Sequence, residues 1–345
     1  MSAAKPKGHV LVTGGAGYIG TTLTDLLLAR GYEVTVVDRF FFGDTLADLR
    51  ANPNLHLVRE DTRSVPPSVL KGVDAVMDLA ALSNDPAGEL DPQKTLDINH
   101  AARARMCKMA KAAGVGRYLL ASSCSIYGFQ DEVVDETSPI NPLTTYAEAN
   151  GLAEQSNLPQ ASEKFTVTAL RQSTVYGLSR RMRFDLAING MTLALHKQGS
   201  VKIMRDGTQW RPMVHVRDTS RAFIAVLEAP KDKVNGEIFN VGSWDQNLQI
   251  RPLAERLSTA VGIPFKEEWY GDPDHRSYRV SFEKIEKRIG YKTQVTPEDG
   301  AREIFEHLQK GTLTDGPTTN TLGWYKTLVQ WGERMREVAP HGVVL

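Results

Sequence analysis

Short apolar runs alternate with longer stretches of mixed polarity through the first 170 residues of the chain. The apolar runs have the length of strands, and they predict strands over 9–13, 33–38, 55–59, 74–79, 116–121 and 165–170. Apolar residues recur at helical spacing between them, which predicts helices over 18–30, 44–50, 95–113 and 146–157. This alternation predicts an α/β fold, with a doubly wound parallel sheet covered by helices on both faces.

The alternation becomes looser beyond Gly177. Helices are predicted over 184–198, 216–228, 250–261, 282–288, 296–310 and 323–338, with short strand-like runs at 213–216 and 237–241. We expect a large sheet domain made of 1–177 and about 213–243, and a smaller, discontinuous α/β domain made of about 178–212 and 244–345. The smaller domain is expected over the carboxyl ends of the strands, where open α/β sheets bind ligands.

A glycine cluster follows the first predicted strand, where residues 10–20 read VLVTGGAGYIG. It fits both G-x-G-x-x-G and G-x-x-G-x-x-G, through Gly14, Gly15, Gly17 and Gly20. Glycine makes the tight turn at low cost, and the amino end of the following helix suits a pyrophosphate. Asp38 ends the second predicted strand, where a carboxylate can accept hydrogen bonds from a ribose diol. The pattern therefore predicts a Rossmann-type dinucleotide site.

Composition narrows the functional class only slightly. The 345 residues carry 41 basic and 41 acidic side chains, so no electrostatic footprint for nucleic acid is expected. The apolar runs are too short to cross a bilayer, and the first residues lead straight into a strand, so neither a membrane span nor a signal peptide is expected. Cys107 and Cys124 have no metal-ligand spacing, which predicts buried thiols, no metal site and a reducing, cytoplasmic location.

Candidate chemistry lies where the fifth strand ends and where the 146–157 helix begins. Residues 119–128 read LLASSCSIYG, a strand that runs into hydroxyl-bearing side chains. Tyr146 and Asn150 are one turn apart, so they share a helix face. A tyrosine can act as a general base only if its pKa falls well below its ordinary value of about 10.

The chain resembles the extended short-chain dehydrogenase/reductase superfamily, in particular the NAD-dependent nucleotide-sugar epimerase/dehydratase family. The motifs that carry this resemblance extend over nearly the whole chain. They are Gly14-Gly-Ala-Gly-Tyr-Ile-Gly20, Asp38, Asp61-Thr62, Leu79-Ala-Ala81, Asn99, Ser122-Ser-Cys-Ser-Ile-Tyr-Gly128, Tyr146, Leu170-Arg-Gln-Ser-Thr-Val-Tyr-Gly177, Arg211 before Val214-His-Val216, and Phe239-Asn-Val-Gly242.

The resemblance implies NAD as the cofactor. It places the glycine loop at the pyrophosphate, Asp38 at the adenosine ribose, and Asp61 and Thr62 at the adenine. The negative charge of Asp38 favours NAD over NADP, although Arg39 beside it works against that preference. The residues implied to contact the cofactor are Gly14, Gly17, Tyr18, Ile19, Asp38, Arg39, Asp61, Thr62, Leu79, Ala80, Ala81, Asn99, Tyr146 and Asn150.

The resemblance also implies catalytic and substrate-binding roles for a nucleotide-sugar substrate. Ser123 would bond the reacting sugar hydroxyl, and Tyr146 would remove its proton. Arg211 and Arg276 match positions that grip the diphosphate, for which a planar bidentate cation is well suited. An ordinary surface salt bridge is the alternative role for each arginine. The full set of implied substrate contacts is Ser83, Ser123, Ser125, Tyr146, Thr174, Asn189, Arg211 and Arg276.

One catalytic position departs from the family pattern Tyr-x-x-x-Lys, because this chain reads Tyr146-Ala-Glu-Ala-Asn150. In the family, the lysine bonds the nicotinamide ribose and lowers the tyrosine pKa. A unit charge about 4 Å away is worth about 4 kcal/mol at an effective dielectric constant near 20, or roughly three pKa units. Three explanations stay open: another means of activating Tyr146, an altered variant of an active enzyme, or a site that binds cofactor with little or no turnover.

The reaction type can be narrowed at the residues after Ser123. Dehydratases of the family carry acidic residues there, whereas this chain has Cys124 and Ser125, which are unsuited to that acid/base work. The hypothesis is an NAD-dependent nucleotide-sugar epimerase that acts on one carbon, C4. The alternatives are a dehydrogenase or reductase that releases its cofactor, and a binding protein without turnover. By resemblance, the 95–113 and 146–157 helices form a homodimer interface.

Overall fold

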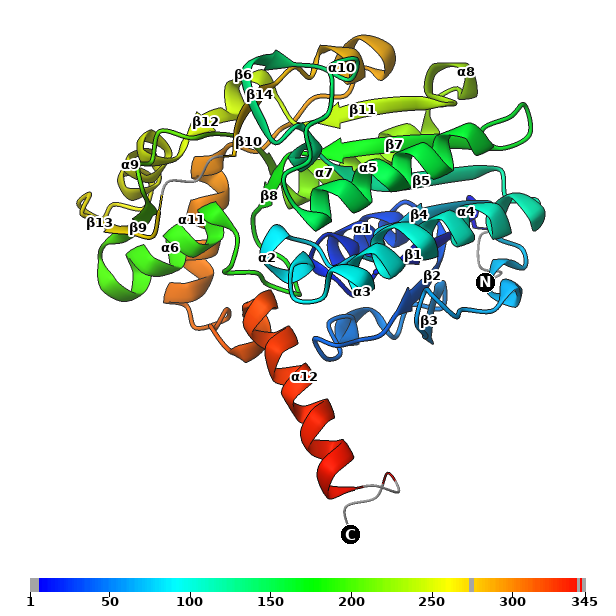
Figure 1. The fold of residues 1–345 in the computed structure, drawn as a ribbon, viewed down its shortest axis with the longest axis horizontal. Coiled ribbons are helices and arrows are strands. Elements are labelled where there is room, and N and C mark those ends of the chain that lie inside the picture. Colours follow the sequence, from blue (N-terminus) through cyan, green and yellow to red (C-terminus); the bar gives the residue numbers. More distant parts are fainter. Residues whose placement is uncertain (1–5, 273–275, 340–341, 343–345) are drawn as a thin grey trace, which may run out of the picture.

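A seven-stranded parallel sheet forms the centre of the computed structural model, which describes residues 6–272, 276–339 and 342 (Figure 1). The strand order is β11-β7-β5-β4-β1-β2-β3. The strands are β1 (His9–Thr13), β2 (Glu33–Asp38), β3 (Leu55–Arg59), β4 (Ala75–Asp78), β5 (Arg117–Ser123), β7 (Thr166–Gln172) and β11 (Glu237–Val241). The order reverses between β1 and β4, and this switch point is where doubly wound sheets bind ligands.

Both faces of this sheet are covered, because successive side chains of a strand point to opposite faces. Val10 and Val12 of β1 pack in one core layer and Leu11 packs in the other. The first layer lies under α1 (Tyr18–Ala29) and α7 (Val216–Glu228), and the second under α4 (Ala102–Ala112) and α5 (Thr145–Asn157). Strands buried on both faces read as continuous apolar runs, which explains why the sequence pattern locates them.

A smaller lobe lies beside the carboxyl ends of these strands. Its sheet has the order β12-β10-β8 and contains β8 (Thr174–Tyr176), β10 (Trp210–His215) and β12 (Asn247–Gln249). A second pair joins β9 (Val201–Met204) to β13 (Glu267–Tyr270), and a third joins β6 (Phe129–Val134) to β14 (Ser277–Val280). A separate apolar core packs among α6 (Ala187–Gln198), α9 (Ile250–Ala260) and α11 (Pro297–Gln309).

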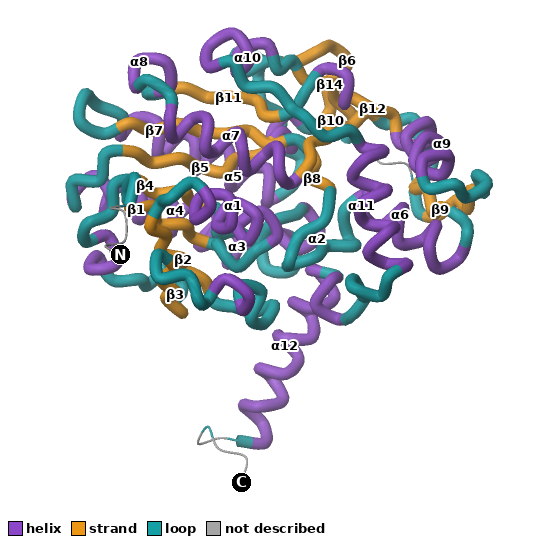
Figure 2. The backbone as a smooth tube through the Cα atoms, turned by 180° about the vertical axis from the view of Figure 1, so that it is seen from behind, coloured by secondary structure: helices purple, strands orange, loops and turns teal. Residues whose placement is uncertain are grey.

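The remaining helices are short, except for the last one. They are α2 (Asp85–Gly88), α3 (Pro92–Leu96), α8 (Lys231–Val234), α10 (Glu283–Ile289) and α12 (Thr321–Val338). A π-helical turn (Asp97–Ala101) joins α3 to α4. Figures 1 and 2 show α12 projecting from the body, and its first turn is fastened by the Trp324 indole N–H, which donates to the Phe41 carbonyl at 2.6 Å.

The structure confirms most of the predicted elements and corrects two points. Residues 44–50 form no α-helix, only a short 3₁₀ turn at Ala47–Leu49, because Leu46 is the one side chain of that segment that is buried. The predicted strand at 213–216 corresponds to the end of β10, which pairs with β8 and β12 in the small sheet. The division into two domains stays a prediction.

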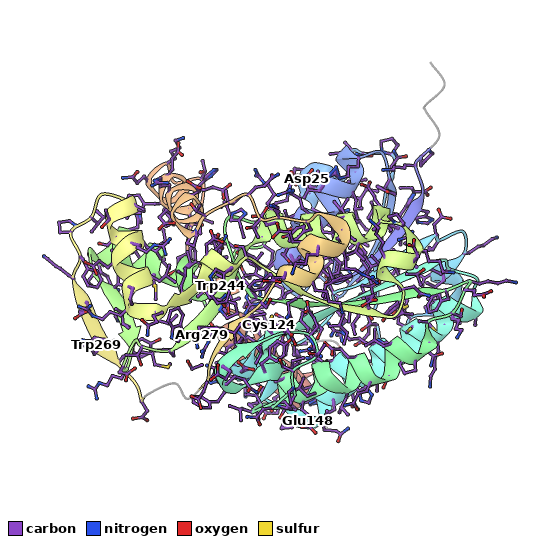
Figure 3. The ribbon with its side chains drawn as sticks, turned by 90° about the horizontal axis from the view of Figure 1, so that it is seen from above. Asp25, Cys124, Glu148, Trp244, Trp269 and Arg279 are labelled. Carbon is purple, nitrogen blue, oxygen red and sulfur yellow. The ribbon has the colours of Figure 1, made fainter. Side chains whose placement is uncertain are left out.

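Both cysteines are buried and free, as expected from their positions. Cys107 packs in the layer between α4 and the sheet, and burial raises its thiol pKa to about 12. Cys124 lies in the interior, whereas Glu148 lies on the exposed side of α5 (Figure 3). These thiols are therefore packing residues.

Candidate active site

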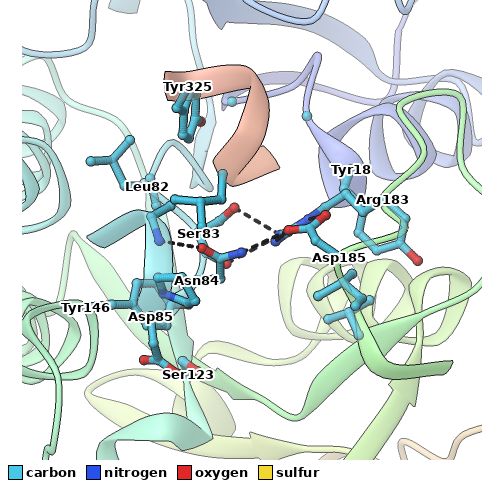
Figure 4. A pocket seen from close by; sticks show the side chains of 18 of the residues that line it. Tyr18, Leu82, Ser83, Asn84, Asp85, Ser123, Tyr146, Arg183, Asp185 and Tyr325 are labelled. Atoms are coloured by element: carbon cyan, nitrogen blue, oxygen red, sulfur yellow. Dashed lines mark hydrogen bonds and ion pairs between the residues drawn. The ribbon is translucent and has the colours of Figure 1, made fainter. Parts of the chain in front are cut away.

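A cavity of about 1430 Å³ opens over the carboxyl ends of the parallel strands. Its walls come from the loops after β1, β2, β3, β4 and β5, from α5 and α12, and from the smaller lobe. Figure 4 shows Ser123, Tyr146 and Asp85 close together on one side, and Tyr18 and Arg183 across from them. Most of the residues predicted to bind cofactor or substrate line this one space. The exceptions are Asn99, Asn150 and Asn189.

The glycine loop has the geometry required of a pyrophosphate cradle. Gly14 adopts a φ of +67°, and a Cβ there would lie 2.9 Å from the Ala80 backbone. A Cβ on Gly20 would lie 2.2 Å from the Gly14 carbonyl oxygen. No side chain caps α1 at Gly17, and residues 17–20 line the cavity. The uncapped amino end of the helix fits a diphosphate, so these residues fit a bound dinucleotide.

Asp38, at the end of β2, is held by two backbone N–H groups. Its Oδ2 accepts a hydrogen bond from Ala16 N at 3.1 Å, and its Oδ1 accepts one from Phe40 N at 2.8 Å. Burial raises the pKa of this carboxyl, and the two N–H groups oppose the rise. Each carboxylate oxygen can accept a further bond, so Asp38 fits a ribose diol.

Arg39 lines the same part of the cavity but is engaged by a carboxylate. Its Nη1 lies 2.7 Å from Asp61 Oδ2, and Arg63 Nη2 lies 2.6 Å from the same oxygen. The Arg39 guanidinium also stacks on the Phe41 ring, 4.5 Å from its centre. The hydrogen bonds from Arg63 hold the pKa of Asp61 well below its usual range, so this carboxylate is charged at neutral pH.

Two of the predicted contact residues lie behind the cavity wall and shape it. Asn99 is fully buried, and its amide both accepts from Leu82 N at 2.9 Å and donates to Leu82 O at 3.0 Å. Asn189 is also fully buried, and it accepts from Gly177 N at 2.9 Å and donates to Tyr18 Oη at 3.0 Å. Their amides brace the loops that line the cavity.

Ser123 and Tyr146 face the cavity from adjacent elements. Ser123 ends β5, and its Oγ accepts from Ser125 N at 3.1 Å. Tyr146 lies in the first turn of α5, which begins where Thr144 Oγ1 caps the Ala147 N–H at 3.2 Å. Burial raises the pKa of the Tyr146 phenol, while the Ser123 hydroxyl, the Arg103 charge and the Asn150 amide oppose that rise. The two hydroxyls form the polar centre of this wall.

Asn150 does not line the cavity, but it connects the wall to a buried cation. Its Nδ2 donates to the Tyr146 carbonyl at 2.9 Å, and its Oδ1 accepts from Arg103 Nη1 at 3.1 Å. Arg103 lies on α4, is 3% exposed and lines the cavity. Sequence reasoning missed this arginine. The available signal was its place on the apolar stripe of the helix, seven residues beyond Leu96 and three before Met106.

Several further arginines line the cavity. Arg276 pairs with Asp85, and Arg211 donates to the Trp210 carbonyl at 2.9 Å and to the Arg276 carbonyl. Arg183, which sequence reasoning also missed, pairs with Asp185 at 2.7 Å. The other predicted substrate contacts also line the cavity, and these are Ser83, Ser125 and Thr174.

Residues 10–242 match the model of the NAD dependent epimerase/dehydratase family, and the chain belongs to that family. A UDP-glucuronic acid decarboxylase 1 of Xenopus tropicalis is 27% identical over 318 residues, which cover 89% of this chain and 73% of that protein. A UDP-glucuronate 4-epimerase of Thermodesulfobacterium geofontis is 27% identical over 312 residues, 86% of this chain and 94% of that protein.

Among solved structures, MoeE5 in complex with UDP-glucuronic acid and NAD matches with a TM-score of 0.77 at 28% identity. The match covers 88% of this chain and 100% of MoeE5. The predicted Rossmann-type fold, the extended short-chain dehydrogenase/reductase class of enzyme and the NAD cofactor are thereby confirmed.

Within residues 6–272, 276–339 and 342, no helix has the length and hydropathy needed to cross a membrane. No three or more His, Cys, Asp or Glu side chains within those ranges gather into a group that could hold a metal ion.

Proposed function

We propose that this protein is an NAD-dependent nucleotide-sugar 4-epimerase, which oxidises and re-reduces C4 of the sugar through a keto intermediate. The observation that carries the proposal is the pair formed by Ser123 and Tyr146 on the wall of a cavity whose other end is the glycine loop. The sequence similarity to a UDP-glucuronate 4-epimerase and the likeness to MoeE5, solved with UDP-glucuronic acid and NAD, support the substrate class.

The size of the cavity supports two ligands side by side. Sites for one drug-sized ligand enclose about 300–1,000 Å³, and this cavity encloses about 1430 Å³. Gly14, Gly17 and Asp38 are suited to the dinucleotide, which supplies a hydride acceptor when it is bound. Arg211 and Arg276, which also line the cavity, are suited to the diphosphate of a sugar nucleotide.

Tyr146 and Ser123 have separate roles in the proposed reaction. Tyr146 takes the proton of the sugar hydroxyl at its phenolic oxygen and later returns it. Ser123 bonds the same hydroxyl and fixes its orientation. Oxidation at one carbon needs no further acid or base, and the residues after Ser123 provide none: Cys124 Sγ donates into the protein to Arg171 O at 3.2 Å, and Ser125 presents a hydroxyl.

The test incubates purified protein with UDP-, dTDP- and GDP-sugars in D₂O, without added NAD, and follows products by NMR. We expect C4 epimers with no deuterium on the sugar carbons, because only the hydroxyl proton passes through Tyr146 and exchanges. The control variant Tyr146→Phe should lose about 10²–10⁴-fold in rate. Stoichiometric consumption of added NAD would instead indicate a dehydrogenase, CO₂ release from a uronate would indicate a decarboxylase, and no turnover would indicate a binding protein.

We also infer a homodimer formed through α3, α4 and α5. These helices lie side by side on one face of the sheet (Figure 1), and Glu148 and Lys108 are exposed on their outer side. Sedimentation velocity should give twice the 38.1 kDa chain mass. Charge reversal at both exposed positions should shift the equilibrium towards single chains, and an unchanged dimer would place the interface elsewhere.

A further inference from the structure

Arg103 carries a buried positive charge without a carboxylate partner in the described part of the chain. Its guanidinium donates to three uncharged oxygens: Ala80 O at 3.2 Å, Ala121 O at 3.0 Å and Asn150 Oδ1 at 3.1 Å. Removing an ion from water costs several kcal/mol unless opposite charge or hydrogen bonds compensate it. Buried charges without an ion-pair partner are typical of functional sites, and Arg103 lies on the cavity wall that carries Tyr146.

Asn150 joins this cation to the catalytic helix. It occupies the position of the family lysine, one turn after Tyr146, and it is 1% exposed. One end of its amide is fixed by the Tyr146 carbonyl, and the other end accepts from the guanidinium. A lysine at position 150 would compete with Arg103 for space, and its positive charge would repel the guanidinium. The asparagine therefore complements the arginine, and the two side chains form one arrangement.

We propose that Arg103 supplies from α4 the positive charge that the family lysine supplies from α5, and that Asn150 positions its guanidinium behind Tyr146. This inference rests on the proposed role of Tyr146 as the base. Arg103 is a positioning and electrostatic residue in this scheme, and its charge favours the phenolate form of the tyrosine. Its hydrogen bonds within the described residues use Nε and Nη1, which leaves Nη2 for a ligand in the cavity.

The other charged groups around Tyr146 are engaged elsewhere. Asp85 on α2 opposes the phenolate, but it is paired with Arg276, which precedes β14. The neighbouring helices contribute Lys94, paired with Asp91; Glu154, paired with Arg171; and Glu148, which is exposed on the outer side of α5. Among the described groups named here, Arg103 is the cation whose charge no carboxylate offsets. An arginine stays protonated throughout the working pH range, so its effect on Tyr146 does not vary with pH.

The experiment moves the charge between the two helices. The variants are Arg103→Met, Arg103→Lys, Asn150→Lys and the double variant Arg103→Met/Asn150→Lys. Each is compared with its Tyr146→Phe counterpart by ultraviolet titration of the phenol, with and without NAD, so that the pKa of Tyr146 is read independently of turnover. The pH profile of kcat/KM is measured in parallel, and circular dichroism verifies folding.

We expect Arg103→Met to raise the pKa of Tyr146 by about 1–2 units. Arg103→Lys should raise it less, and the double variant should return it towards the wild-type value. Asn150→Lys alone places two cations together, so it should lower both the thermal stability and the pKa of Tyr146. A folded Arg103→Met protein with an unchanged Tyr146 titration would overturn the inference, and so would a double variant that matches Arg103→Met.

Two further outcomes are also decisive. If Arg103→Met does not fold, Arg103→Lys is compared with the folded double variant instead. A Tyr146 pKa that is the same whether the cation lies at position 103 or at position 150, and that equals the wild-type value in neither, overturns the inference. If the Tyr146 titration shifts as expected but no sugar nucleotide is turned over, the inferred electrostatic role of Arg103 stands and the proposed epimerase activity fails.

Discussion

Replacing Gly20 with alanine tests the cradle at the amino end of α1. The new Cβ would lie 2.2 Å from Gly14 O and 2.6 Å from Gly15 Cα, whereas ordinary contacts begin at 3.4 Å. The obstructing atoms belong to the backbone, so no side-chain rotation relieves the contact. The loop and the helix must separate by about 1 Å, and forced overpacking of this kind costs about 1–3 kcal/mol.

The same displacement should weaken NAD binding. Gly14 O accepts from Gly17 N at 3.0 Å, and this bond shapes the turn that presents the first helical N–H groups to the cavity. Moving these donors by about 1 Å takes them out of hydrogen-bonding range of a diphosphate. We expect the Kd for NAD to rise at least about tenfold, equivalent to about 1.4 kcal/mol.

Titration calorimetry of cofactor-stripped protein measures this loss, and thermal unfolding measures the strain. Gly332→Ala on the projecting helix α12 is the matched control, because nothing lies within 4 Å of its new Cβ. That control should stabilise the helix by up to about 1 kcal/mol and leave NAD binding unchanged. If Gly20→Ala keeps both the NAD affinity and the melting temperature of the wild type, the close-approach argument is wrong.

Three other predictions address charges. Glu154→Gln should lower the free energy of unfolding in urea by about 3–5 kcal/mol, because it leaves the guanidinium of Arg171 buried without its partner at 2.7 Å. The double variant Glu154→Leu/Arg171→Met should recover most of that free energy, and equal losses in the two variants would contradict the argument. Asp38→Asn should lower the ratio of the Kd for NADP to the Kd for NAD about tenfold, because it removes the charge that repels a 2′-phosphate. An unchanged ratio would mean that other residues determine the selectivity. The pKa of Asp61 is depressed in the folded state, so the stabilisation by its ion pairs is present above about pH 4 and is lost as pH falls through the folded-state pKa. Arg63→Met should therefore move acid unfolding, followed by circular dichroism, to higher pH. The loss in free energy of unfolding should stay below about 1 kcal/mol, because the pair is partly exposed.

The sequence predicts the central sheet well, because its strands are buried on both faces and read as unbroken apolar runs. Several strands of the smaller lobe carry no such signal in the sequence. In β6 and β13 most positions are exposed or half-buried, so neither a continuous apolar run nor a clean alternation marks them. The wrong helix at 44–50 has the same origin, since a single buried leucine cannot define a helical face.

The candidate site divides in a similar way. The glycine loop, Ser123 and Tyr146 belong to local motifs whose geometry follows from neighbouring residues. The contact between Arg103 and Asn150 joins positions 47 residues apart, and it depends on how α4 rotates against α5. No periodicity in one segment reveals which residue of another will meet it. The missing lysine is visible in the sequence, but the cation near Tyr146 is visible only in the fold.

Tyr18 ties the first turn of α1 to the smaller lobe. Its hydroxyl donates to Gly177 O at 2.6 Å, directly after β8 of the smaller lobe, and Ser179 Oγ donates to the Tyr18 carbonyl at 2.7 Å. The turn that seats the dinucleotide is therefore joined to the smaller lobe by two hydrogen bonds. On the proposed function, a sugar nucleotide that favours one position of this lobe would change the affinity for NAD, and NAD would change the affinity for the sugar nucleotide by the same factor.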